Sequence, residues 1–192
     1  SNLSGSGSSA SISETLTNTS TAPVSVVYLV TLTANGCSNT QSVTVVVNPT
    51  PVLTSSQTPA AICNNGTFSY TATSATSGVS FGWTRAVVAG ISNGSGSGSS
   101  AAVSEVLTNT TTDPISVVYR FTLTANGCSN TQDVTVVVNP TPLLTSSQTP
   151  TAICSGSTFS YSATSATAGT TYSWSRAVIT GISNALGSGS SS

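Results

Sequence analysis

Apolar side chains alternate with serine and threonine along most of this chain. A period of two residues is typical of a β-strand with one buried face, because successive side chains point to opposite sides. No segment shows the 3.6-residue period of an amphipathic helix. The pattern predicts an all-β protein with strands in the central region at residues 67–75, 79–86, 102–107, 116–125 and 133–138.

A tight turn is predicted between the last two of these strands. Asn126 and Gly127 stand between two alternating runs, and both central positions of a type I′ turn need a positive φ. Asn35 and Gly36 repeat the signal earlier in the chain.

Within each alternating run, the bulky side chains occupy every second position, so each run presents one apolar face. Two sheets can bury such faces against each other in a layer about 10 Å thick. Arg120 occupies one of the positions between these bulky residues and is expected to point outward. The candidate core aromatics are Tyr28, Phe68, Tyr70, Phe81, Trp83, Tyr119, Phe159, Tyr161, Tyr172 and Trp174.

The chain is a tandem repeat. Residues 37–63 and 128–154 are almost identical, and a constant offset of 91 residues relates Cys37 to Cys128 and Trp83 to Trp174 with no insertion. Arg85 and Arg176, and Glu14 and Glu105, obey the same offset. Repetition of this kind indicates a structural unit used several times and argues against one chemical site.

Proline-containing linkers divide the repeats. The sequence Asn-Pro-Thr-Pro follows a Val-rich strand in both copies and contributes the candidate linker residues Pro49, Pro51, Pro140 and Pro142. Residues 51–139 then form a complete domain. Residues 1–48 are the C-terminal half of one repeat, and residues 142–192 are the N-terminal half of another.

A half-domain cannot bury its apolar face alone, so each end needs completion by another chain segment. Two arrangements supply it. In the first, which we favour, the polypeptide is longer and continues covalently into further repeats. In the second, the trailing strands of one copy pair with the leading strands of the next, a heterologous contact that propagates into a filament.

Charge is scarce. Charged residues make up 4% of the chain, the net charge is −1, and lysine and histidine are absent, whereas an ordinary domain has about 25% charged residues. The absence of a basic surface argues against nucleic-acid binding, and no apolar run approaches the roughly 20 residues of a membrane span. Low charge permits copies to assemble, because little electrostatic repulsion separates them. The alternative interpretation is a secreted sandwich whose solubility comes from its serine and threonine hydroxyls.

Four cysteines, Cys37, Cys63, Cys128 and Cys154, are disulfide candidates of an exported protein. Their spacing does not fit a zinc site. A bond between Cys63 and Cys128 would close a loop within the complete domain, although such positions tend to lie at opposite ends of a sandwich. The alternative is a disulfide between the end of one domain and the start of its neighbour. Under either scheme, Cys37 and Cys154 would find partners outside this chain or in neighbouring copies.

Candidate catalytic, cofactor and metal residues are lacking. Without histidine or lysine the ordinary general base and amine nucleophile are missing, and no clustered carboxylates suit calcium. Glu105 and Asp113 are interpreted as solitary solvated charges, the Gly-Ser-Gly-Ser segments as flexible loops, and Trp83 as a core residue in preference to a sugar-stacking one. We therefore expect no enzyme and no cofactor.

The pattern resembles the PKD-like, immunoglobulin-like repeats of very large secreted or surface proteins of gliding-type bacteria, similar to those of Bacteroidota. The matching segments are Cys63 with Gly66–Thr71, residues 81–86, and residues 119–128 before the final Val-rich strand. The resemblance covers the whole chain and implies Greek-key sandwiches, export by a dedicated route, and adhesion or spacer roles without catalysis. The acidic turn of typical PKD domains is absent.

These observations favour a structural repeat of an extracellular or cell-surface filament, stalk or adhesin shaft, whose partners are copies of itself, covalently continuous or head to tail. The alternative is an adhesion module that binds carbohydrate or a surface through its Ser/Thr-rich faces or Gly-Ser loops. Exposed aromatics on a flat face would favour that alternative.

Overall fold

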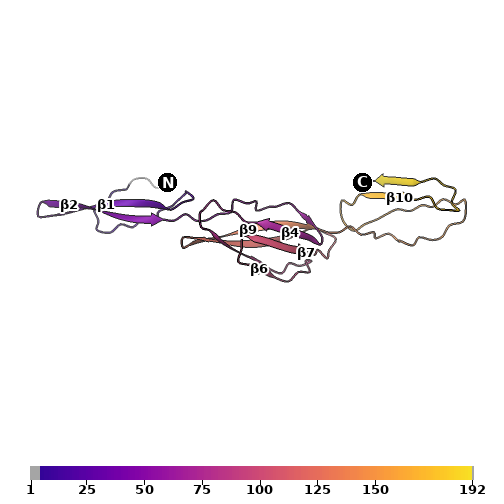
Figure 1. Cartoon of the computed structure of the whole chain (residues 1–192), viewed down its shortest axis with the longest axis horizontal. Coiled ribbons are helices and arrows are strands. Elements are labelled where there is room, and N and C mark those ends of the chain that lie inside the picture. Colours follow the sequence, from indigo (N-terminus) through magenta and orange to yellow (C-terminus); the bar gives the residue numbers. More distant parts are fainter. Residues whose placement is uncertain (1–4, 192) are drawn as a thin grey trace.

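The computed structural model describes residues 5–191, in which strands and connecting segments follow one another along a long axis (Figure 1). A β-sandwich occupies the centre, a two-stranded hairpin precedes it, and a second two-stranded sheet follows it. All assigned elements are strands, and the all-β sandwich fold class is confirmed.

The central sandwich contains seven strands. One sheet has the order β3-β9-β8-β5-β6, and β4 pairs with β7 in the other. The strands are β3 (Ile62–Cys63), β4 (Gly66–Thr71), β5 (Ser80–Arg85), β6 (Gly96–Gly98), β7 (Ala102–Leu107), β8 (Ile115–Ala125) and β9 (Cys128–Asn139). Asn126 and Gly127 join β8 to β9 with φ angles of 51° and 80°, which confirms the predicted turn.

The inner faces of the two sheets form one hydrophobic core. Tyr119 is completely buried at its centre, and its ring centroid lies 4.9 Å from that of Phe68 and 5.6 Å from that of Trp83. Tyr70 is buried in the same cluster, and Phe81 packs against it while remaining partly exposed. Alternation along β8 and β9 produces this result, since every second residue faces β4 and β7.

The segment that leads into the sandwich runs parallel to β9. The side chain of Asn130 donates to the Pro51 carbonyl (3.0 Å), Thr135 N–H donates to the Gln57 carbonyl (2.8 Å), and β3 then pairs with the end of β9. The leading segment therefore starts beside the first residues of β9 and finishes beside its last. As a result, the chain enters the sandwich at one end and leaves at the other.

The N-terminal part repeats the β8–β9 hairpin. β1 (Val24–Ala34) pairs with β2 (Cys37–Val47) in the register of their counterparts. Asn18 donates to the Val47 carbonyl at 2.7 Å, as Asn109 in the central sandwich donates to the Val138 carbonyl at 2.9 Å. This part therefore has the local structure of the second half of a repeat.

The C-terminal part repeats the first half. β10 (Tyr172–Arg176) pairs with β11 (Gly187–Ser191), as β5 pairs with β6. The isolated bridge between Leu144 and Ser165 matches the one between Leu53 and Ser74.

The Gly-Ser segment next to Trp83 is a strand, so its interpretation as a flexible loop was wrong. β6 pairs with β5, and the indole of Trp83 lies against its backbone. A Cβ atom at Gly98 would come within 2.5 Å of Trp83 Nε1, and one at Gly189 would come equally close to Trp174 Nε1. Glycine is therefore required by the packing of tryptophan on the strand.

We expect the substitution Leu123→Ala to lower the free energy of unfolding by about 2–5 kcal/mol, because it opens a cavity in a fully buried position. The matched control is Leu32→Ala, its counterpart on the N-terminal hairpin, which is 54% exposed and should change stability by less than about 0.5 kcal/mol. Urea titration of dilute protein measures both. Equal effects would contradict the assignment of the core.

Candidate assembly surfaces

The N-terminal hairpin exposes residues whose counterparts are completely buried. Leu123 and Val134 have no exposed surface in the central sandwich, whereas their counterparts Leu32 and Val43 are 54% and 55% exposed. The candidate core residue Tyr28 is half-buried, although its counterpart Tyr119 is not exposed at all. The hairpin thus presents one uncovered apolar face.

The C-terminal part exposes the complementary half of the core. Phe159 and Trp174 are 55% and 59% exposed, against 2% and 9% for Phe68 and Trp83. The expectation that Phe159, Tyr161 and Trp174 are core residues is therefore wrong for the chain by itself, and Tyr172 is only half-buried. The reason is that no counterpart of β7, β8 or β9 packs on these residues within the described part of the chain.

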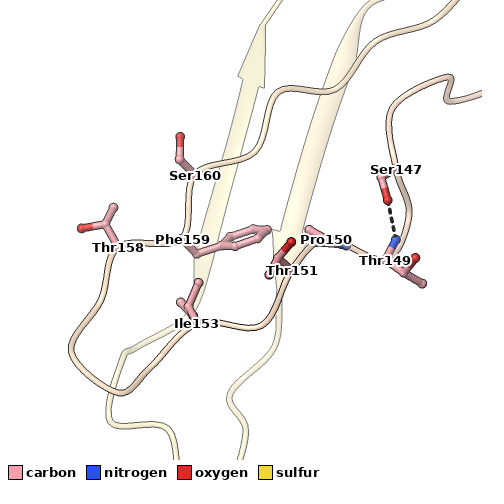
Figure 2. Close-up of a pocket in the computed structure, with 8 residues that line it drawn as sticks. All are labelled: Ser147, Thr149, Pro150, Thr151, Ile153, Thr158, Phe159 and Ser160. Carbon is pink, nitrogen blue, oxygen red and sulfur yellow. Dashed lines mark hydrogen bonds between the residues drawn. The ribbon is translucent and has the colours of Figure 1, made fainter.

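A groove of about 490 Å³ marks the uncovered area (Figure 2). The ring of Phe159 lies across it between Ile153 and Pro150, and short hydroxyl side chains surround the ring. In the central sandwich the counterpart of Phe159 is buried beneath the opposite sheet. The groove is therefore the place that strands of the second half of a repeat occupy in the complete unit.

A buried ion pair connects the two sheets of the central sandwich. Arg85 on β5, with 1% of its side chain exposed, donates from Nε (2.9 Å) and Nη2 (3.1 Å) to the two carboxylate oxygens of Glu105 on β7. Tyr119 on β8 donates its hydroxyl to Glu105 at 2.6 Å. Glu105 is thus not a solitary solvated charge, and that interpretation was wrong.

The network shifts the ionisation of its members. Hydrogen bonds from Arg85 hold the pKa of Glu105 below its ordinary value, against the opposing effect of burial, and the Tyr119 hydroxyl acts in the same direction as Arg85. Burial, followed by the hydrogen bond to Glu105, raises the pKa of Tyr119. The ionised carboxylate is therefore the form that the fold stabilises.

The flanking parts contain the same network in two separate pieces. In the N-terminal part Tyr28 donates its hydroxyl to Glu14, and this bond raises the pKa of Tyr28. In the C-terminal part Arg176 donates to the carbonyls of Ala177 and Ala185. The acid and the tyrosine thus lie on one surface, and the arginine that would complete them lies on the other.

A second ion pair is a surface feature. Arg120 points outward, as expected, and donates to Asp133 at 2.9 Å, with 64% and 44% of the two side chains exposed. Asp133 is therefore also paired, although solvent surrounds the pair and weakens it.

The linkers are packed. Pro49, Pro51 and Pro140 are buried, whereas Pro142 is exposed. The Asn48 side chain donates to the Asn126 carbonyl in the β8–β9 turn at 2.8 Å. The end of the N-terminal hairpin is therefore held against the turn of the following sandwich.

All four cysteines are free in this structure. Cys63 is paired with Asn139 at the end of β9, whereas Cys128 begins that strand. Eleven residue steps separate the two ends, about 36 Å at strand spacing, and a disulfide needs Cα atoms within about 7 Å. The expected bond between Cys63 and Cys128 of one sandwich is therefore wrong.

The described residues contain no group of three or more His, Cys, Asp or Glu side chains that could hold a metal ion. Within the same part of the chain, no helix has the length and apolar character needed to cross a membrane.

The two facing sheets, with β3 parallel to β9, define an immunoglobulin-like β-sandwich. Residues 1–51 and 60–142 match the PKD-like domain family, and the chain belongs to that family. The resemblance to PKD-like domains is thus confirmed. A comparison with curated proteins gave no match.

We expect Glu105→Gln to lower the free energy of unfolding by about 2–3 kcal/mol, since it leaves Arg85 buried without its counter-charge while a fifth of Glu105 remains in contact with water. The folded-state pKa of Glu105 lies below its ordinary value of 4.5. Its stabilisation is therefore fully present above about pH 4.5 and is lost as the pH falls through the lower, folded-state value.

Urea midpoints measured between neutral and acidic pH check this prediction. Wild type should lose stability on acidification more steeply than Glu105→Gln does. Asp133→Asn, in the exposed pair, is the control and should have a much smaller effect at neutral pH. Parallel acid profiles of wild type and Glu105→Gln would contradict the proposed contribution of this carboxylate.

Proposed function

We propose that this chain is a structural repeat unit of an extracellular filament, stalk or adhesin shaft, in which near-identical sandwiches follow one another end to end. One observation carries the proposal: the faces exposed on the two flanking parts are the two opposing halves of the core that the central sandwich buries. Its role is mechanical, because the same contacts recur along one axis.

The two flanking parts correspond to complementary halves of the repeat. The N-terminal part corresponds to the second half of the repeat and carries the counterparts of β8 and β9, while the C-terminal part carries those of β5 and β6. Together, one part of each kind contains the sequence counterparts of all the strands of the central sandwich. The central domain therefore serves as a template for how a β1–β2 hairpin would cover the groove at Phe159.

Charge complementarity supports the same pairing. Arg176 is the counterpart of Arg85, and Glu14 and Tyr28 are the counterparts of Glu105 and Tyr119. Joining the two parts would rebuild the buried network seen in the centre. In a chain with 4% charged residues, such a specific pair favours one register over others.

The neighbour that supplies the missing half is a copy of the same repeat, either in a second chain or in a continuation of one polypeptide. Entry and exit at opposite ends of the sandwich support an extended array. Membership of the PKD-like family supports a place outside the cell, in a secreted or surface protein. Such a shaft needs no cofactor and no catalytic residue.

Carbohydrate or surface binding is the less favoured function. Trp83 is buried, and Trp174 is exposed on the face whose counterpart is core. These aromatics are therefore better explained as halves of an incomplete sandwich than as a sugar-binding platform.

We expect the purified chain to form linear assemblies as its concentration rises, under reducing conditions, because each copy carries both complementary halves. Arg176→Glu and Glu14→Arg should each block assembly by burying two like charges at the new contact, and the double variant should restore it. Sedimentation velocity and electron microscopy measure the result.

Arg120→Glu is the control, because this exposed arginine lies outside the joined surfaces and its loss should leave assembly unchanged. A chain that stays monomeric at all concentrations, with its terminal aromatics solvent-exposed by fluorescence quenching, would contradict the proposal.

A further inference from the structure

The cysteines occupy the two opposite ends of each sandwich. Cys63 lies beside Asn139, where the chain leaves the sandwich, and Cys128 follows the β8–β9 turn, where the chain enters. Cys154 and Cys37 are their respective counterparts in the flanking parts. Every sandwich of an array thus has one cysteine at its exit and one at its entrance.

The first linker, at residues 48–51, shows how the exit of one unit meets the entrance of the next. Asn48, the counterpart of Asn139, donates to the carbonyl of Asn126, and Asn126 is two residues before Cys128. The cysteine paired with the exit asparagine would therefore lie close to the turn of the following sandwich. In Figure 1 the β1–β2 hairpin precedes the central sandwich along the long axis, as this order requires.

We propose that disulfide bonds across these junctions connect each copy of the chain to the next copy, with Cys63 bonded to Cys37 of the second copy and Cys154 bonded to Cys128 of the second copy. The inference rests on the proposed end-to-end assembly, and it identifies the covalent partner. Both bonds join the exit of one sandwich to the entrance of the next, so the geometry of one junction applies to both.

The first bond follows from the central sandwich. Cys63 is paired with Asn139, and Asn139 would contact Asn35 of the next copy just as Asn48 contacts Asn126. Cys37 is two residues beyond Asn35. The second bond follows from the completed sandwich, in which Cys154 would pair with Asn48 of the next copy, beside the turn that precedes Cys128.

Bond formation needs an oxidant, and the one proposed is a small disulfide such as oxidised glutathione. One cysteine thiolate attacks the glutathione disulfide and releases one glutathione thiolate. The second cysteine thiolate then attacks the mixed disulfide, forms the protein disulfide and releases a second glutathione. Two protein thiols are oxidised as one glutathione disulfide is reduced to two thiols. Cys37, Cys63 and Cys154 are exposed, which gives the reagent access.

Two double variants of the full chain, each lacking two cysteines, test the pairing after oxidation with oxidised glutathione. Cys63→Ser with Cys37→Ser removes one proposed bond and leaves the other, so a ladder of covalent oligomers should persist on a non-reducing gel. Cys63→Ser with Cys128→Ser removes one partner from each bond, and the ladder should be lost. Peptide mapping should find Cys154 bonded to Cys128 in the first variant.

The opposite pattern would overturn the proposal. Bonds between the two cysteines of one sandwich, Cys63 with Cys128 and Cys154 with Cys37 of a second copy, would remove the ladder in the first variant and keep it in the second. Cysteines that stay reduced in assembled wild-type protein would also overturn it.

Sedimentation under a reducing agent separates this inference from the function on which it rests. Assembly in reducing buffer, combined with cysteines that do not form the predicted disulfides after oxidation, would overturn the inference alone. Failure to assemble in reducing buffer would overturn both.

Discussion

Burial of one sheet by the other is the constraint on which the rest of the structure depends. The core of the central sandwich forms only because β8 and β9, from the end of the repeat, cover side chains of β4, from its beginning, while β8 pairs with β5 in its own sheet. Where only one half of a repeat is present, the same side chains are exposed to water. The hydrophobic effect then favours contact with any neighbour that buries these exposed side chains again.

The buried network of Arg85, Glu105 and Tyr119 adds specificity to this nonspecific attraction. A buried ion pair contributes little net stability when the cost of removing both charges from water is included, but a wrong register would leave one charge buried alone. Almost every other polar group in the chain is an uncharged hydroxyl or amide. The few charges present are therefore well placed to define which faces meet.

The course of the leading segment beside β9 decides where the chain enters and leaves the sandwich. Because this segment is parallel to β9, the entrance and the exit of the sandwich are far apart, and successive units extend in a line. Buried linker prolines and the contact between Asn48 and Asn126 hold neighbouring units against each other. In the filament that we propose, load would pass through packed junctions of this kind.

The sequence by itself determined the repeat, the strand-forming alternation, the turn at Asn126 and Gly127, and the parity that places Phe68, Trp83 and Tyr119 in the core. These features depend on neighbours within a few residues, whose geometry alternation and turn preferences describe well. Only the tertiary structure showed that Glu105 meets Arg85, that Gly96–Gly98 is a strand covered by an indole, and that Cys63 and Cys128 lie at opposite ends of β9. Each of these depends on which strands become neighbours and on whether they are parallel. Residue spacing along the chain does not contain that information, because long-range strand pairing is decided by how the whole core closes.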